Sequence, residues 1–264
     1  MTATLPEVVR PLLDEYLALL EEKLPGLVGG FYLQGSLALD AFNARLSDID
    51  FVAFLNRGWT TRDLTELQNI HDTLHQKYRR WPVEGLFLEW PGQADPAKVV
   101  LPYLNQHMGK ITLESTFELN DVTWWLLKEK GIALKGPEAH SLGYSVDWQA
   151  LLAGMYRNQN TYWASYTRKP GRMAQLLTGW GIEWAVLGSL RQLYTFREND
   201  ITSKSGAGRY ALKNLPAKWH PLVQEALNLR EQPDAPSLYT SKVFRAFQAV
   251  RFLRYVRKEC NRFS

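Results

Sequence analysis

The sequence predicts an α+β protein of two domains, and two patterns of apolar residues carry this prediction. Short apolar runs bounded by turn-forming residues, which are typical of buried strands, alternate with helical patterns before about residue 135. From about residue 145 onward, apolar residues recur only with the spacing of helices. The turn-forming pair Gly136-Pro137 lies between the two patterns. We therefore expect a first domain over residues 1–140 and an all-α helical domain over residues 145–264.

The first domain is expected to begin with a helix that ends at Pro25-Gly26. A buried strand at Phe31–Leu33 follows, and Gly35-Ser36 then forms a tight polar turn before a short helix over residues 37–42. The second strand, Phe51–Phe54, comes directly after the acidic stretch at residues 48–50. The remaining predicted elements are a helix over residues 62–78, a strand over 82–90, a helix over 122–130 and a strand over 132–135.

Asp48 and Asp50 stand two residues apart at the start of the second strand. Because residues two apart in a strand point to the same face, the two carboxylates are aimed at one place, while Ile49 points into a core. Two carboxylates held together are costly unless a cation lies between them, and hard oxygen ligands suit Mg²⁺ shared with substrate phosphates. Gly35 allows close approach of a phosphate, and Ser36 offers both a hydroxyl and a main-chain N–H.

The pattern Gly35-Ser36 followed by Ser47-Asp48-Ile49-Asp50 resembles the signature of the nucleotidyltransferase superfamily that includes DNA polymerase beta. The resemblance extends to bacterial aminoglycoside adenylyltransferases of the streptomycin/spectinomycin type. It implies a catalytic domain built on a mixed sheet flanked by helices, and a helical domain that closes the active-site cleft. It also implies that Gly35, Ser36 and Ser47 bind the triphosphate of ATP, and that Asp48 and Asp50 bind one or two Mg²⁺.

The third strand offers two candidates for the third carboxylate that this chemistry needs, either as a metal ligand or as a general base. Glu84 and Glu89 are five residues apart, so they face opposite sides of a strand. Glu84 enters the strand at the position that carries this carboxylate in the adenylyltransferases that the chain resembles. We therefore expect Glu84 to have this role, with Glu89 as the alternative.

The helical domain contains helices predicted over residues 148–167, 181–197, 216–230 and 241–261. Between the second and third lies a segment around Lys204 that resembles the part of the streptomycin-type enzymes where a lysine contacts the nucleotide phosphates. A lysine at a helix N-terminus presents its charge beside N–H groups already suited to an anion. Arg191 lies on an otherwise apolar helix face, and either binds the triphosphate, pairs with a carboxylate of the first domain, or packs its stem on the core.

One departure from the family concerns the acceptor. Where the streptomycin enzymes carry an acidic residue that holds the cationic drug, this chain has Gly181-Ile182, and Glu183 is the only acid close by. The departure concerns the substrate and leaves the phosphate chemistry unchanged.

Composition narrows the remaining classes of function. The 264 residues include no apolar run near the ~20 needed to span a bilayer, and the N-terminus lacks the layout of a secretory signal. The single cysteine, Cys260, can form no internal disulfide, which agrees with a cytoplasmic protein. A net charge of +4 is compatible with phosphate-bearing ligands but too small to indicate nucleic-acid binding.

Taken together, the residues and the resemblance predict Mg²⁺-dependent transfer of AMP from ATP to a hydroxyl of an aminoglycoside or aminocyclitol, with release of pyrophosphate. The protein is expected to be a monomer or homodimer. Three alternatives stay open: a regulatory or antitoxin-type nucleotidyltransferase that acts on a protein partner, an adenylyltransferase of another metabolite, and a binding module without catalysis.

Overall fold

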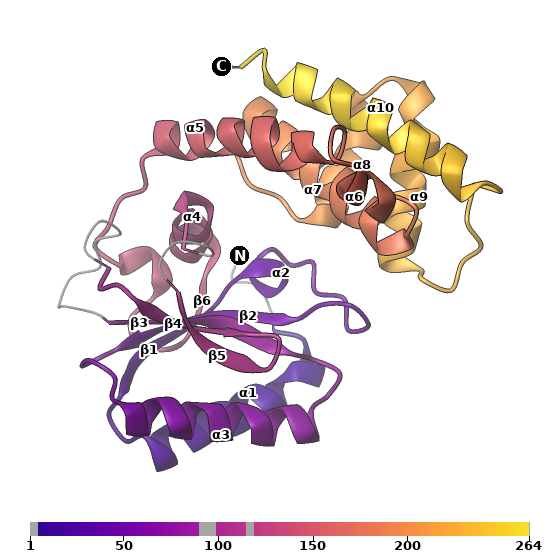
Figure 1. The fold of residues 1–264 in the computed structure, drawn as a ribbon. Coiled ribbons are helices and arrows are strands. Elements are labelled where there is room, and N and C mark those ends of the chain that lie inside the picture. The colour runs from indigo at the N-terminus through magenta and orange to yellow at the C-terminus, as the bar shows by residue number, and fades with distance from the viewer. Residues whose placement is uncertain (1–4, 90–98, 115–118, 264) are drawn as a thin grey trace. The chain divides into compact units, whose positions relative to one another are not determined.

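The structure, a computed structural model, describes residues 5–89, 99–114 and 119–263 (Figure 1). The chain divides into two compact units, Met1–Asp147 and Trp148–Ser264. The N-terminal unit combines a mixed sheet with helices, and the C-terminal unit is helical, which confirms the expected α+β class.

A six-stranded sheet with the order β5-β4-β3-β2-β1-β6 forms the centre of the N-terminal unit. Only the β2–β3 pair is parallel among the pairs of this sheet, and the other neighbours run antiparallel. The strands are β1 (Val28–Leu33), β2 (Ile49–Leu55), β3 (Val83–Glu89), β4 (Tyr103–His107), β5 (Lys110–Glu114) and β6 (Ile132–Lys135). The strand expected over residues 82–90 is described over Val83–Glu89, and Trp90 lies outside the described residues.

Helices cover both faces of this sheet, as Figure 1 shows with α1 and α3 on one side and α4 on the other. Alternation along β2 assigns its side chains: Ile49 and Phe51 belong to the core under α1 and α3, while Val52 and Phe54 belong to the smaller core with Trp124 of α4. The helices of this unit are η1 (Glu7–Val9), α1 (Arg10–Lys23), α2 (Gly35–Ala38), α3 (Thr61–Lys77), α4 (Asp121–Lys130) and η3 (Ala139–Ser141).

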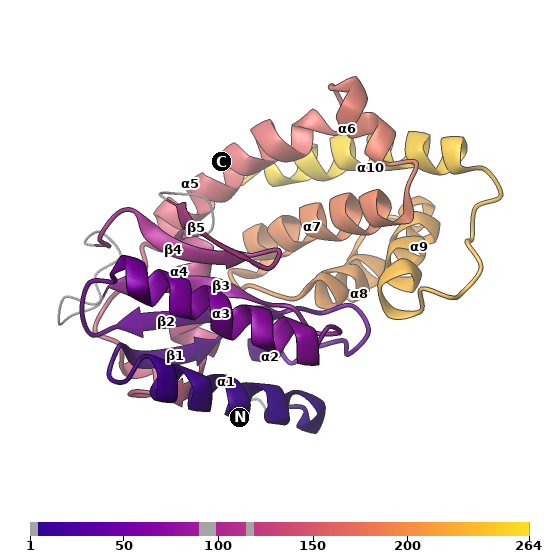
Figure 2. The ribbon, with the colours of Figure 1, turned by 60° about the horizontal axis from the view of Figure 1, so that its bottom comes forward.

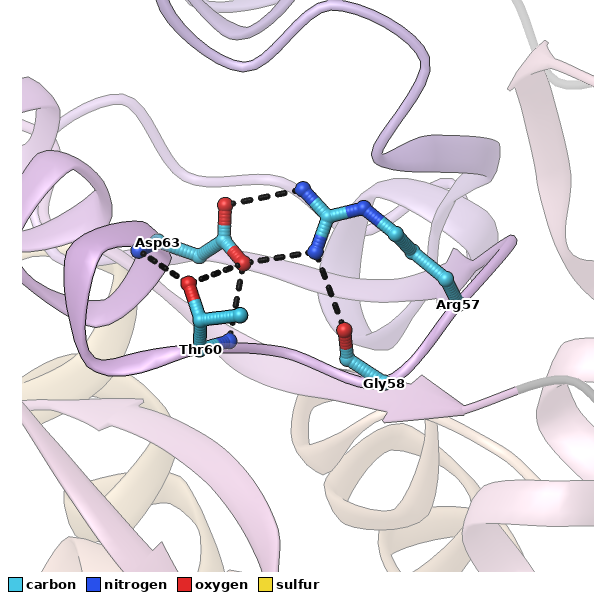
Figure 3. Close-up of polar contacts among 4 residues, drawn as sticks. All are labelled: Arg57, Gly58, Thr60 and Asp63. Atoms are coloured by element: carbon cyan, nitrogen blue, oxygen red, sulfur yellow. Dashed lines mark hydrogen bonds and ion pairs between the residues drawn. The ribbon is translucent and has the colours of Figure 1, made fainter.

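Helix α3 begins at a capping box, drawn in Figure 3. The Thr60 hydroxyl accepts a hydrogen bond from the Asp63 main-chain N–H at 3.2 Å, and the Asp63 carboxylate accepts one from the Thr60 N–H at 2.8 Å. The Arg57 guanidinium donates to both oxygens of Asp63, at 2.7 and 3.0 Å. These contacts, led by the one with Arg57, lower the pKa of Asp63 to about 2.

His71 of α3 is buried between α1 and the sheet, where its Nε2 lies 2.7 Å from the Tyr16 hydroxyl. Burial lowers the pKa of His71 to about 3, so the imidazole is neutral in the folded protein. The histidine therefore contributes a polar contact to the core.

The C-terminal unit is organised around α7, which runs beside α9 and α10 (Figure 2) and also packs against α8. A π-helical turn, η4, continues α5, so the helix predicted over residues 148–167 is present with an irregular second half. The elements are α5 (Trp148–Asn158), η4 (Gln159–Trp163), α6 (Pro170–Gln175), α7 (Gly179–Glu198), α8 (Lys204–Asn214), η5 (Ala217–Trp219), α9 (His220–Glu231) and α10 (Lys242–Cys260).

Two expectations about the local structure after β1 are wrong. Gly35-Ser36 is the first turn of helix α2 and does not form a separate tight turn, and the helix over residues 37–42 does not form. The helix is short because Asp40 adopts a left-handed φ of 49°, which is incompatible with a continuing right-handed helix.

Candidate active site

Three polar side chains from adjacent strands lie in one row on the α4 side of the sheet. Asp50 of β2 is the register partner of Glu84 of β3, and Gly85 of β3 is the partner of Gln106 of β4. The second pairing places Glu84 opposite His107. Directly paired residues share a face, so Asp50, Glu84 and His107 are neighbours. Asp48 stands two residues before Asp50, immediately before β2 begins.

Gly35 brings the main chain of α2 against the Asp50 carboxylate. A Cβ atom added at Gly35 would lie 1.8 Å from Asp50 Oδ2, and Gly35 has a positive φ of 60°. Both the space and the backbone conformation therefore require glycine at this position. The sequence motif joins α2 and β2 in one site although the ten residues 37–46 separate Gly35-Ser36 from Ser47-Asp48-Ile49-Asp50.

Two serines of the motif have different surroundings. The Ser36 Oγ is buried and has no hydrogen-bond partner among the described residues, so a bound ligand could supply one. The Ser47 Oγ accepts a hydrogen bond from the Asn43 main-chain N–H at 3.0 Å, and Ser47 is buried. Ser47 therefore holds the loop before Asp48 as well as carrying a hydroxyl proton that it can donate.

The Glu84 carboxylate is fixed by the hairpin of β4 and β5. Its Oε2 lies 2.8 Å from His107 Nδ1, and its Oε1 accepts a hydrogen bond from the Met108 main-chain N–H at 3.2 Å. Glu89 lies at the other end of β3 on the opposite face, close to Gly58. Of the two candidates, Glu84 is thus the one on the face of Asp50.

The oxygen-rich donor set fits Mg²⁺. Within residues 5–89, 99–114 and 119–263, no group of three or more His, Cys, Asp or Glu side chains has the arrangement of a metal site. Mg²⁺ does not need such a preformed group, because proteins usually bind it through one or two carboxylates together with water and substrate phosphates. Asp48 and Asp50 can supply those two carboxylates. The Ser36 hydroxyl can donate a hydrogen bond to a phosphate oxygen.

A second charged cluster lies in the C-terminal unit, around Glu183 of α7. Glu183 Oε1 accepts from Arg230 Nη1 at 2.8 Å and from Lys204 Nζ at 3.3 Å, so two cations share one carboxylate oxygen. The Lys204 Nζ also lies over the ring of Trp184, 4.6 Å from its centroid. All three charged side chains are mostly buried, with exposed fractions of 12 to 21%.

Lys204 is the first residue of α8, as the sequence predicts, and Ser203 caps that helix by accepting from the Gly206 N–H at 3.0 Å. Burial lowers the pKa of Lys204; Glu183 opposes this shift, while Arg230 and Arg191 add to it. Arg191 belongs to the same surroundings, since its Nε donates to the main-chain oxygen of Thr202 at 3.0 Å. The structure thus brings Arg191 and Lys204 together and adds Arg230.

The start of α7 has no room for an acidic side chain at Gly181. A Cβ atom at Gly181 would lie 1.9 Å from the main-chain oxygen of Gln175, because the chain before α7 folds tightly against it and Thr178 caps the helix through the Gly181 N–H. Glu183 does not replace that acid, since its carboxylate already pairs with Lys204 and Arg230.

Sequence reasoning missed three residues of these two clusters: His107, Trp184 and Arg230. His107 lies in a stretch without clear periodicity, and its contact with Glu84 spans 23 residues. Arg230 is 47 residues from Glu183. No local sequence pattern identifies pairs of residues that lie so far apart along the chain.

The mixed sheet with its row of Asp50, Glu84 and His107, together with a separate helical unit, is the architecture expected of a nucleotidyltransferase with an additional helical domain. Residues 159–253 match the family described as aminoglycoside adenylyltransferase, C-terminal domain. This match lies within the C-terminal unit and confirms the resemblance to aminoglycoside adenylyltransferases there.

A solved structure shares the fold of nearly the whole chain. It is the spectinomycin adenyltransferase AAD(9) from Enterococcus faecialis, crystallised with ATP and spectinomycin. The TM-score is 0.67 at 13% sequence identity, over 95% of this chain and 98% of that one. No curated protein sequence matches the chain. Along the part of the chain that the structure describes, every helix is too short or too polar to cross a membrane.

Proposed function

We propose that this protein transfers AMP from ATP to a hydroxyl group of an aminocyclitol or aminoglycoside, with Mg²⁺ bound and pyrophosphate as the second product. One observation carries the proposal: Asp50 and Glu84 are register partners on one face of the sheet, with Asp48 and the glycine-serine turn of α2 beside them. This row has the oxygen donors and the base that phosphoryl transfer to a hydroxyl requires.

In this reaction, Asp48 and Asp50 hold Mg²⁺, and Gly35, Ser36 and Ser47 bind the triphosphate. Two observations support these roles. The Ser36 hydroxyl has no partner among the described residues, and the main chain at Gly35 lies close to the Asp50 carboxylate. When bound, Mg²⁺ neutralises charge on the phosphates and orients the α-phosphate.

Glu84 is the general base. It takes the proton of the attacking hydroxyl while the oxygen forms a bond to the α-phosphorus and the bond to the pyrophosphate breaks. Its position beside Asp50 supports this role over Glu89, which lies on the other face.

Lys204 and Arg191 supply positive charge for the phosphates from the C-terminal unit. Their shared location around the start of α8 supports this role, because Arg191 lies near Lys204 while Lys204 and Arg230 share a single carboxylate, that of Glu183. The excess of positive charge suits a polyanionic ligand.

The acceptor is an aminocyclitol of low charge. Gly181 leaves no room for the acid that holds streptomycin in the related enzymes, and Glu183 is already paired. The structural neighbour was crystallised with spectinomycin, which supports an aminocyclitol as the acceptor. The cytoplasmic location and the monomeric or dimeric state stay predictions.

The test is pyrophosphate release from Mg-ATP against a panel that includes spectinomycin and streptomycin, with Asp48→Ala as the blank. We expect release that depends on spectinomycin, is weaker or absent with streptomycin, and disappears in the variant. A regulatory enzyme would instead show no release with any compound, keep its binding of Mg-ATP in calorimetry, and co-purify with a second protein that it modifies.

A further inference from the structure

We propose that His107 is a positioning residue for the general base: together with the Met108 main-chain N–H, it holds the Glu84 carboxylate in the orientation that accepts the proton of the attacking hydroxyl. This inference rests on the proposed function, because it assigns a partner to the base of that reaction.

The contacts fix the plane of the carboxylate. His107 Nδ1 lies 2.8 Å from one oxygen of Glu84, and the Met108 N–H reaches the other oxygen at 3.2 Å. Two donors on different oxygens restrain the rotation that a single hydrogen bond leaves open. Each oxygen of a carboxylate keeps a further lone pair, so the bound carboxylate can still accept a proton.

The contact also assigns the tautomer of the imidazole. An ionised carboxylate can only accept hydrogen bonds, so His107 Nδ1 carries the hydrogen and donates it to Glu84 Oε2. The side chain of His107 is 49% exposed, against 20% for Glu84. A half-exposed histidine contributes little to a core, so a role in packing does not account for its position.

The hairpin that carries both donors has methionine at a turn position with positive φ. Met108 and Gly109 both have positive φ, 49° and 76°, and they join His107 to its partner Lys110 in a two-residue turn. Such a conformation is uncommon for methionine, and its side chain is 80% exposed, so burial of that side chain does not compensate for it. The turn directs the Met108 N–H at Glu84.

Gln68 of α3 fixes this turn to the rest of the unit. Its Nε2 donates to the main-chain oxygen of Gly109 at 3.0 Å, and its Oε1 accepts from the Ile111 N–H at 2.9 Å. The support of Glu84 thus continues from the base through the turn to a helix of the core.

The first experiment compares His107→Leu with His107→Asn under saturating Mg-ATP and the acceptor that the panel identifies. Asparagine places an amide N–H near the position of Nδ1, whereas leucine has no donor. We expect His107→Leu to lower kcat at least tenfold with an unchanged KM for ATP and an unchanged Tm, and His107→Asn to keep most of kcat. Equal turnover of His107→Leu and the wild type would overturn the inference while leaving the proposed function intact.

A second measurement needs no turnover. The ¹⁵N spectrum of the histidines, at a pH where His107 is neutral, should show the Nδ1–H tautomer in the wild type and its loss in Glu84→Ala. The Nε2–H tautomer in the wild type would overturn the inference even if no acceptor were found. If this tautomer test succeeds and the wild type releases no pyrophosphate, the contact stands and it is the proposed function that fails.

Discussion

The two units hold their charged side chains in different ways. In the N-terminal unit, Asp50, Glu84 and His107 stand in a row because three strands are paired in a defined register. In the C-terminal unit, Lys204 and Arg230 meet at Glu183 because three helices pack together, and the ion pairs themselves hold the side chains. In the sheet, backbone pairing of the strands thus determines where the acids lie. In the helical unit, ion pairs with Glu183 hold Lys204 and Arg230 in position.

This difference has a consequence for substitution. Replacing an acid in the sheet should remove chemistry and leave the fold, because backbone hydrogen bonds maintain the register. Replacing a charged residue in the bundle should disturb its partners too, because a buried ion that loses its counterion is strongly destabilising. The predictions below test this contrast.

The largest expected effect is on the chemistry of the sheet. Asp50→Asn keeps the shape of the side chain but removes its charge, so turnover should fall by more than about 10³-fold while Tm changes little. Asp40→Asn is the matched control, since Asp40 is exposed and asparagine tolerates its left-handed φ. Pyrophosphate release and thermal unfolding measure the two quantities. A large fall in Tm for Asp50→Asn would show that the register depends on the carboxylate.

The next effect is on the stability of the bundle. Arg245 donates to Glu225 at 2.8 Å, and the two side chains are 5% and 1% exposed. Burial raises the pKa of Glu225, but hydrogen bonds from Ser237, the Leu238 N–H and Arg245 outweigh burial and bring this pKa below its ordinary value. Arg245→Met leaves this carboxylate without its cation and should lower the free energy of unfolding by about 3–5 kcal/mol.

Urea denaturation measures this change, and Arg251→Met is the control, because Arg251 is exposed on the same helix. A loss of stability no larger than in the control would show that the ion pair does not hold the bundle together.

The third effect is on the acid stability of the sheet unit. The pKa of His71 is about 3 in the folded protein, below the ordinary value of 6.5. The unfolded chain therefore takes up a proton below pH 6.5 that the folded chain refuses, and stability is lost as the pH falls, by up to about 1.4 kcal/mol per pH unit. His71→Gln keeps a hydrogen-bond partner for Tyr16 and cannot titrate, so it should flatten this slope.

Chemical denaturation at several pH values between 7 and 4 measures that slope. Asp63 contributes a separate loss only at lower pH, because its pKa is lowered from 3.8 to about 2. An unchanged slope in His71→Gln would show that other groups take up the protons.

The smallest expected effect is on nucleotide affinity. Lys204→Met removes one of three cations and leaves Glu183 paired with Arg230, so Kd for Mg-ATP should rise about tenfold with little change in stability. Lys213→Met is the control, since Lys213 is exposed on the same helix. Calorimetry gives both constants. The same Kd in the two variants would remove Lys204 from the phosphate site.

The contrast also explains what could be predicted from the sequence. The two-residue period of a strand suffices to separate Glu84 from Glu89, because strand geometry is local. Asp48 lies just before β2, so its place on the same side as Asp50 stays a prediction. The helix start at Lys204 is local as well. The contacts of His107 with Glu84 and of Arg230 with Glu183 are not, since they depend on which strand pairs with which and on how helices pack. The site roles of all these residues stay predictions until the variants are measured.

The parallel pairing of β2 and β3 has a consequence for how the gene can change. The paired residues of the two strands follow one another without a bulge from Ile49↔Val83 to Leu55↔Glu89. Substitution alters one side chain at a time, but deletion or insertion of a single codon within β3 would turn its downstream side chains to the opposite face or shift them along β2. Related genes should therefore vary in length in their loops and keep the spacing within these two strands constant.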